Sequence, residues 1–302
     1  MGEIYLARRT CVRGFARDVA VKRISKPFAK DPDYVEMFLR EARLAALLDH
    51  PNIVQVHELV ADDDYCLVME YVPGMSLSRC MKLHQGPLPL PVAVQIAAQV
   101  AAGLQYVHDM RDSHGEPLGL VHRDISPPNV MLSNWGVAKI TDFGIAKFRV
   151  ASALSQAGVI KGKFSYLAPE QARGEPLDHR ADIYSLGLVL YEMTVGTCAY
   201  FGPDAKVLAK VQRSDFPLPE VMQPHYPGDL RAVVMRALAA DPYERYSCCR
   251  EIQRELVALL ASRGHSASGE PVARFLRVIA GDSDAIFEEA SAPGLSGRSC
   301  RS

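Results

Sequence analysis

The sequence predicts an α+β protein of two lobes, a small strand-rich lobe over residues 1–72 and a larger, mainly helical lobe over residues 73–262. Short stretches in which apolar and polar residues alternate dominate the first part, as is typical of strands. Longer segments with apolar residues at helical spacing dominate the second part. With 302 residues, the chain is long enough for each lobe to bury a core of its own.

The small lobe is predicted to contain two pairs of strands with one helix between the pairs. The expected strands cover residues 2–9, 18–24, 53–60 and 65–72. The first pair turns around Arg13 and Gly14, and the second turns at the acidic stretch 61–64. The helix over residues 33–49 ends at the breaker His50-Pro51-Asn52.

The large lobe is predicted from three long segments with an apolar face. These helices cover residues 91–110, 182–196 and 227–242. Residues 263–302 follow as a C-terminal extension, with one amphipathic helix that begins near residue 269 and a flexible Gly/Ser-rich end. One apolar face of this last helix packs on the large lobe or docks another protein.

Composition excludes several classes of partner. A net charge of -1 gives no electrostatic reason to expect nucleic acid or an anionic membrane. We expect no membrane span, since no uninterrupted apolar run approaches ~18–20 residues. The seven cysteines are scattered, without paired CxxC motifs, so we expect reduced thiols in a cytoplasmic protein rather than a zinc site.

The stretch 119–147 carries the most informative side chains. Asp124 and Asp142 lie 18 residues apart, Asn129 lies between them, and the short segments "VMLS" and "VAKI" predict a strand pair that brings them together. One carboxylate is suited to orient an attacking hydroxyl, while the second carboxylate and the amide are suited to hold Mg²⁺ on nucleotide phosphates. A single Asp in a loop more often caps a turn. The combination of His122-Arg123-Asp124, Asn129 and Asp142-Phe143-Gly144 favours phosphoryl transfer.

These motifs resemble those of eukaryotic-type (Hanks-type) Ser/Thr protein kinases of bacteria, and the segments "HRDISPPN" and "GKFSYLAPEQ" are similar to those of myxobacterial kinases. The resemblance covers residues 1–262 and implies a two-lobed kinase-like fold, with helix αC in the small lobe. It implies that Lys22 of "VAVK" contacts the α- and β-phosphates of ATP and that Glu41 positions this lysine. It also implies that Asp124 orients the substrate hydroxyl and that Asn129 and Asp142 hold Mg²⁺, with Mn²⁺ as an alternative.

The resemblance further implies a nucleotide site and three structural residues. Met69 stands at the gatekeeper position and Glu70 to Val72 form the hinge. The other residues implied to contact the nucleotide are Gly2, Ile4, Ala20, Lys22 and Met131. Glu170 is implied to form a buried ion pair with Arg245, and Asp182 to brace the catalytic loop.

Four departures from the family pattern stand out. Only the third glycine of the glycine-rich loop is present, as Gly2, so the first strand and half of the phosphate lid are missing. We expect the true start codon to lie upstream, with a truncated protein as the alternative; the chain as written is then expected to bind ATP weakly. Ser126 replaces the usual lysine of the catalytic loop, and we hypothesise that Lys163 supplies the missing cation.

The other two departures concern regulation and substrate choice. The segment from Gly144 to Ala168 contains no threonine, so Ser155 and, second, Ser152 are the expected phosphorylation sites, with Arg123 as the phosphate's partner. Pro128 stands where an acidic residue is common, which removes one reason to expect basic substrate peptides.

The function predicted from these residues is an ATP-dependent protein Ser/Thr kinase that also phosphorylates itself, with a homodimer as a route to autophosphorylation in trans. The alternative is a catalytically weak, pseudokinase-like binding module. The intact Lys22, Asp124, Asn129 and Asp142 argue for the enzyme, whereas the missing glycines and Ser126 argue for the module. A small-molecule phosphotransferase is a more distant alternative.

Overall fold

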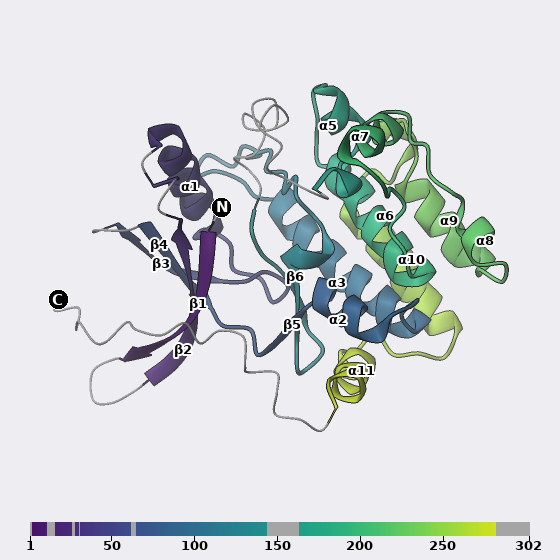
Figure 1. Cartoon of the computed structure of the whole chain (residues 1–302), viewed down its shortest axis with the longest axis horizontal. Coiled ribbons are helices and arrows are strands. Elements are labelled where there is room, and N and C mark those ends of the chain that lie inside the picture. The colour runs from purple at the N-terminus through teal and green to yellow at the C-terminus, as the bar shows by residue number, and fades with distance from the viewer. Residues whose placement is uncertain are drawn as a thin grey trace.

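The computed structural model describes residues 2–10, 16–25, 28–29, 31–61, 65–143 and 163–281. These residues form two lobes, with the strands β1 to β4 and helix α1 on one side and most of the helices on the other (Figure 1). The predicted fold class, α+β with two lobes, is confirmed.

The small lobe is an antiparallel sheet in the order β1-β2-β4-β3. Its elements are β1 (Gly2–Thr10), β2 (Ala16–Ile24), α1 (Pro32–Ala45), β3 (Val56–Ala61) and β4 (Tyr65–Glu70). Ile4 pairs with Lys22 and Leu6 pairs with Ala20 across the first two strands. Because side chains alternate along a strand, these four lie on one face of the sheet, and Val19 lies on the other.

Helix α1 begins at a cap that its sequence provides. Asp31 accepts from the backbone N–H groups of Asp33 and Tyr34, and Pro32 occupies the first turn, where its missing N–H costs nothing. The helix ends at Ala45 rather than at the predicted residue 49. Leu47 and Leu48 instead donate to carbonyls three residues earlier, so the last turn tightens before His50 and Pro51.

The predicted strand 53–60 begins later than expected, at Val56, because the residues before it pair with the other lobe. Val54 N–H donates to Ile140 O at 2.9 Å, and Ile140 N–H donates to Asn52 O at 2.8 Å. Asn52 Nδ2 adds a bond to Ala138 O at 2.9 Å. This short connection fixes the small lobe on the β7 end of the large lobe.

The large lobe contains a second sheet and a helical core. The sheet runs β5-β6-β7, from β5 (Gly74–Ser76), β6 (Val130–Ser133) and β7 (Ala138–Ile140). The helices are α2 (Leu77–His84), α3 (Leu90–His108), α5 (Pro169–Arg173), α6 (Arg180–Val195), α7 (Asp204–Gln212), α8 (Pro219–Met222), α9 (Gly228–Ala237), α10 (Cys249–Ser262) and α11 (Glu270–Ala280). Among these, α3, α6, α9 and α11 agree with the helices predicted from the sequence, whereas α10 and the shorter helices were not predicted.

Helix α3 is the one helix among the described residues that is long and apolar enough to cross a membrane. In this fold 72% of the apolar stretch of α3 is buried inside the protein, where the helix packs against α6 and α10. Its apolar run is interrupted by Gln95, Gln99 and Gln105, and its apolar content reflects its place in the core.

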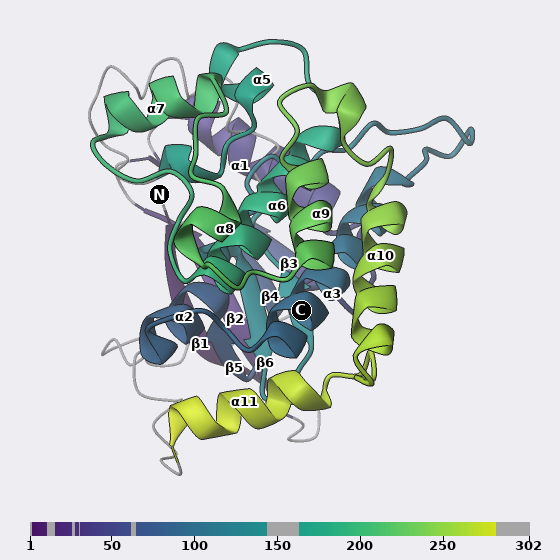
Figure 2. The ribbon, with the colours of Figure 1, turned by 90° about the vertical axis from the view of Figure 1, so that its right-hand side faces the viewer.

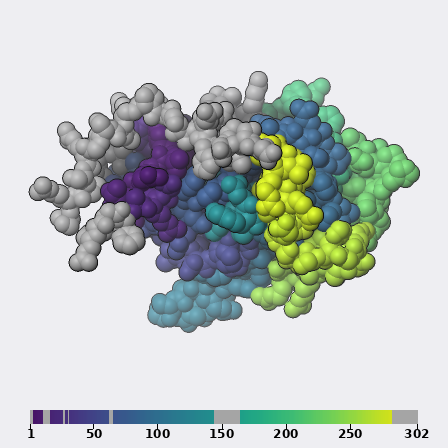
Figure 3. Space-filling model, turned by 90° about the horizontal axis from the view of Figure 1, so that it is seen from below, coloured from purple at the N-terminus to yellow at the C-terminus, as the bar shows by residue number. Residues whose placement is uncertain are grey.

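Helix α11 packs on the large lobe, which is one of the two predicted alternatives for its apolar face. Val272, Ala273 and Leu276 are buried on it, and it lies beneath α2 and α3 in Figure 2. Seen from below, it also lies against the teal surface of the β6–β7 region (Figure 3). The turn of that hairpin approaches it so closely that a Cβ atom on Gly136 would lie 1.9 Å from Gly269 O.

A buried ion pair joins α5 to the segment before α10. Arg245 donates to both carboxylate oxygens of Glu170, at 2.7 and 2.8 Å, and the two side chains are 0% and 4% exposed. The remaining donors of Arg245 reach the backbone oxygens of Ala239, Arg180 and Ala240. Both charges are thus satisfied within the core, as a buried pair requires.

We expect Gly136→Ala to lower the free energy of unfolding by about 2–4 kcal/mol, because the new methyl group displaces α11 in addition to the backbone cost of a positive φ. The matched control is Gly115→Ala, since Gly115 has φ +83° against +80° for Gly136 but no atom near its Cβ. Chemical denaturation of the three proteins measures the difference. Equal losses in both variants would show that α11 is not held tightly at this turn.

Arg245→Met is expected to destabilise the protein by about 3–5 kcal/mol, because it leaves the Glu170 carboxylate buried without a partner. The control is Arg250→Met, which removes an ion pair to Asp109 whose side chains are 52% and 54% exposed. That variant should cost less than about 1 kcal/mol. Thermal denaturation of both variants checks this, and similar melting temperatures would contradict it.

Candidate functional site

Lys22 connects charged groups from both lobes. Its ammonium lies 3.7 Å from Glu41 Oε1 on α1 and 2.5 Å from Asp142 Oδ1 after β7. Burial alone would lower the pKa of Lys22, but the charges of Asp142 and Glu41 outweigh it, and the pKa lies above its ordinary value of 10.5. The structure therefore brings the expected Lys22–Glu41 pair together and adds Asp142 as the nearer partner.

Two hydrogen bonds join Asn129 to Asp124. Asn129 Nδ2 donates to the backbone oxygen of Asp124 at 2.8 Å and to its Oδ2 atom at 2.7 Å. Between them the chain forms the 3₁₀ turn Pro127–Asn129, which accommodates Pro128. These bonds orient the Asp124 carboxylate and leave Oδ1 of Asn129, a carbonyl oxygen, as the atom suited to a metal.

Asp182, fully buried at the start of α6, holds the loop that carries Asp124. Its carboxylate accepts from the backbone N–H groups of His122 and Arg123 and from His108 Nε2, each at 2.8 Å. Burial would raise the pKa of Asp182, but the bond from His108 and the other donors lower it below its ordinary 3.8. This is the bracing position that the resemblance implies.

Two residues of the site adopt a backbone conformation that side chains disfavour. Arg123 has φ 67° and Asp142 has φ 57°, both in the left-handed region. His122 directly precedes Arg123, and Phe143 directly follows Asp142. The centroids of these two rings lie 4.6 Å apart, and Phe143 is buried. The surrounding packing thus maintains a strained arrangement that orients the carboxylates.

Asn129 and Asp142 fit a magnesium site. Thr141 N–H donates to Asn129 O at 3.0 Å, so the residue before Asp142 is bonded directly to Asn129. Mg²⁺ prefers oxygen ligands and keeps waters and substrate phosphates in its shell, so a carboxylate and an amide oxygen suffice. Within the described part of the chain, no group of three or more His, Cys, Asp or Glu side chains could hold a metal.

An apolar cluster joins the two lobes near Lys22. Met69 and Val72 belong to one buried cluster, and Ala20 from β2 and Met131 from β6 pack against it. On the same face of the sheet, Ile4 is 58% exposed. The residues implied to sandwich an adenine ring are therefore brought together from both lobes, with Ile4 uncovered beside them.

The hinge offers fewer backbone groups than the sequence suggested. Glu70 N–H already donates to Gln55 O at 2.8 Å, and its carboxylate binds Lys139 Nζ at 2.9 Å. Gly2 is the first described residue of β1, where it pairs with Ile24.

The predicted regulatory residues are placed only in part. Ser152 and Ser155 lie outside the described residues. Lys163 begins the 3₁₀ turn Lys163–Tyr166, and nothing is described of its side chain. Ser126, which replaces the usual lysine, is nearly buried and its hydroxyl lies 3.4 Å from Asp124 O.

Sequence reasoning missed the residues that support the site from a distance. His108 bonds to Asp182 across 74 positions, and Gln171 donates to Arg123 O across 48 positions. Cys249 Sγ lies 3.7 Å from the other ring nitrogen of His108. None of these contacts leaves a local spacing signal, because each depends on the packing of separate helices.

Comparison with known proteins agrees with this geometry. Residues 2–257 match the model of the protein kinase domain family. The chain is 39% identical over 282 residues to tyrosine-protein kinase MasK of Myxococcus xanthus, which covers 92% of this chain and 44% of MasK. It is 34% identical to serine/threonine-protein kinase PrkC of Bacillus subtilis, over 85% of this chain and 38% of PrkC.

A third relative and a solved structure extend the comparison. Serine/threonine-protein kinase PknB of Mycobacterium tuberculosis is 37% identical, over 85% of this chain and 40% of PknB. The crystal structure of the PknI kinase domain of the same organism superposes with a TM-score of 0.64 at 29% identity, covering 85% of this chain and 91% of that one. The chain thus spans less than half the length of these curated relatives. It belongs to the protein kinase family, as a bacterial member of the Hanks type.

Proposed function

We propose that this chain transfers the γ-phosphoryl group of ATP to serine and threonine hydroxyls of proteins, including its own activation segment. The observation that carries the proposal is the convergence of Lys22, Asp142, Asn129 and Asp124 near an apolar cluster that joins the lobes. A cation for the phosphates, oxygen ligands for a metal and an oriented carboxylate are the parts that phosphoryl transfer requires.

The roles follow from the chemistry of each group. Asp124, held by Asn129 and by the Asp182 network, accepts a hydrogen bond from the substrate hydroxyl. It receives the hydroxyl proton as the new P–O bond forms and the bond from the γ-phosphorus to the β–γ bridging oxygen breaks, which releases ADP. Lys22 exchanges its contact with Asp142 for the α- and β-phosphates and remains positioned by Glu41. Asn129 and Asp142 would hold Mg²⁺, or Mn²⁺ in its place, and the bound ion would supply positive charge to the phosphates.

Two alternatives differ in their support. The comparisons do not support a pseudokinase-like binding module, because the relatives named above are all called kinases. Of the three relatives, MasK is named a tyrosine-protein kinase, whereas PrkC and PknB are named serine/threonine-protein kinases. The segment "HRDISPPN" lacks the Ala/Arg pattern after the Asp that tyrosine kinases carry, which favours serine and threonine.

The domain division and the setting of the protein follow from the same proposal. We assign residues 1–72 and 73–262 to the two lobes, with the hinge at 70–74, and we add α11 to the folded large lobe because its apolar face is buried there. ATP as substrate favours a cytoplasmic catalytic domain. Protein substrates are expected, and a second copy of the chain is the expected partner for autophosphorylation in trans.

Incubation with Mg-ATP is expected to place phosphate on Ser155 or Ser152, located by mass spectrometry. Asp124→Asn should lower kcat by about 10²–10⁴-fold with little change in the KM for ATP, because this carboxylate acts on the hydroxyl. Lys22→Ala should instead weaken ATP binding. Asp109→Asn, an exposed acid at the end of α3, is the control and should leave the rate unchanged. Phosphate on tyrosine alone, or rates in Asp124→Asn equal to the unchanged chain, would contradict the proposal.

Lys163→Thr is expected to reduce the rate, because Lys163 would supply the cation that Ser126 does not. Lys163→Arg should retain most of the activity, since it keeps the charge. Initial rates of phosphate incorporation at saturating ATP measure both. If Lys163→Thr leaves the rate unchanged while Lys22→Ala abolishes it, another group compensates for Ser126.

A further inference from the structure

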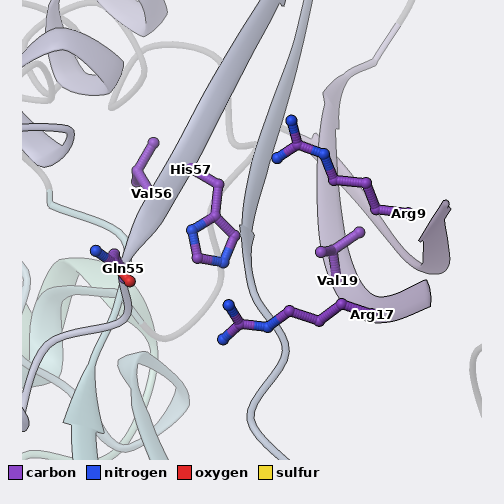
Figure 4. A pocket seen from close by; sticks show the side chains of 6 residues that line it. All are labelled: Arg9, Arg17, Val19, Gln55, Val56 and His57. Atoms are coloured by element: carbon purple, nitrogen blue, oxygen red, sulfur yellow. The ribbon is translucent and has the colours of Figure 1, made fainter. Parts of the chain in front are cut away.

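A basic pocket lies on the face of the small-lobe sheet that is turned away from the nucleotide site. It has a volume of about 370 Å³ and is lined by Arg9, Arg17, Val19, Gln55, Val56 and His57 (Figure 4). Arg17 and Val19 lie on the same face of β2, and Arg9, which pairs with Arg17, lies on that face of β1. Ala20 and Lys22 point to the opposite face of the sheet. The pocket is therefore separate from the site proposed for ATP.

The two arginines form a repulsive pair. Arg9 and Arg17 stand directly opposite each other on β1 and β2, and like charges in that position destabilise a sheet. Arg9 is partly neutralised by Glu58, at 3.1 Å, with both side chains 48% exposed. For Arg17, no ion pair is found within the described part of the chain. An excess of positive charge therefore remains at the pocket.

His57 on β3 lies close enough to the two arginines for their charge to affect its pKa. Its Nε2 atom is buried and has no hydrogen-bond partner among the described residues. Burial and then the charges of Arg17 and Arg9 lower the pKa of His57, and Glu70 opposes them. Figure 4 shows both arginine side chains extending from their strands toward the side where the His57 ring lies. A buried polar atom without a partner calls for a group to satisfy it.

We infer that this pocket binds a phosphate monoester dianion. Two guanidinium groups and one imidazole supply three donors from three strands, and a phosphate monoester presents three acceptor oxygens with a charge of about −1.5 to −2. The volume of the pocket lies in the range of about 300–1,000 Å³ that small-ligand sites occupy. The phosphate is carried either by a phosphoserine side chain or by a small molecule.

The test is a titration of His57 in the whole chain, followed by NMR of its ring protons and assigned with a His57→Gln variant. Inorganic phosphate is expected to raise the pKa of His57, because a bound anion stabilises the imidazolium form. Exposed His114 should not respond. This readout does not involve phosphoryl transfer, so it stands whether or not the chain is an active kinase.

Substitution of Arg17 provides the decisive comparison. Arg17→Gln should weaken phosphate binding about tenfold or more, as expected for loss of a charge-assisted hydrogen bond. Even without phosphate it should raise the pKa of His57, because the charge of Arg17 lowers it. The matched control is Arg8→Gln, which lies one residue before Arg9 on the opposite face, 70% exposed and paired with Asp18. It should bind phosphate like the unchanged chain.

A second probe, a short phosphoserine peptide, separates the two sources. Tighter binding of the peptide than of inorganic phosphate would assign the pocket to phosphorylated protein segments, and the reverse would assign it to small phosphates. The inference fails if neither probe shifts His57, if the shift persists in Arg17→Gln, or if an unphosphorylated glutamate peptide binds as tightly as phosphoserine.

Discussion

The site depends on one buried carboxylate. Asp182 has no exposure to water, and it accepts three hydrogen bonds, two from the backbone of the catalytic loop and one from His108. Because its folded pKa lies below 3.8, the stability that it contributes is present at neutral pH and is lost only as the pH falls below that value. The left-handed backbone at Arg123, and with it the orientation of Asp124, is maintained by these bonds.

The connection between the two lobes links this loop to the hinge and to the Lys22 ion cluster. The backbone of residues 52–54 pairs with Ile140, and Lys139 binds the carboxylate of Glu70 at the hinge. β7 therefore touches the hinge, the small lobe and, through Asp142, the ion cluster of Lys22. On its other side, the turn of the same hairpin contacts α11 at Gly136. The hydrogen bond from Thr141 N–H to Asn129 O ties the segment after β7 to the catalytic loop.

The sequence predicted those parts of the fold that local patterns encode. Alternation identified the strands of the small lobe, and the acids and amide of residues 119–147 identified the chemistry before any contact was known. Element ends were less predictable. Helix α1 ends early because Leu47 and Leu48 donate to carbonyls three residues earlier, and β3 starts late because the distant Ile140 pairs with the backbone of Asn52 and Val54. His108 and Gln171 were missed for the same reason: neither has a local motif, and their role comes from contacts across 74 and 48 positions.

The two faces of the small sheet show how one strand can serve two purposes. Along β2, Ala20 and Lys22 face the apolar cluster and the acids between the lobes, while Arg17 and Val19 face the basic pocket. Because the side-chain period of a strand is two, a slip of one residue in the β1–β2 register would move both sets to the wrong face at once. Lys22 is held by acids that fix its place, whereas Arg17 faces Arg9 without such compensation from its own strand pair. A sheet that tolerates this repulsion gains a binding surface behind its catalytic face, and the two faces share the backbone that positions both.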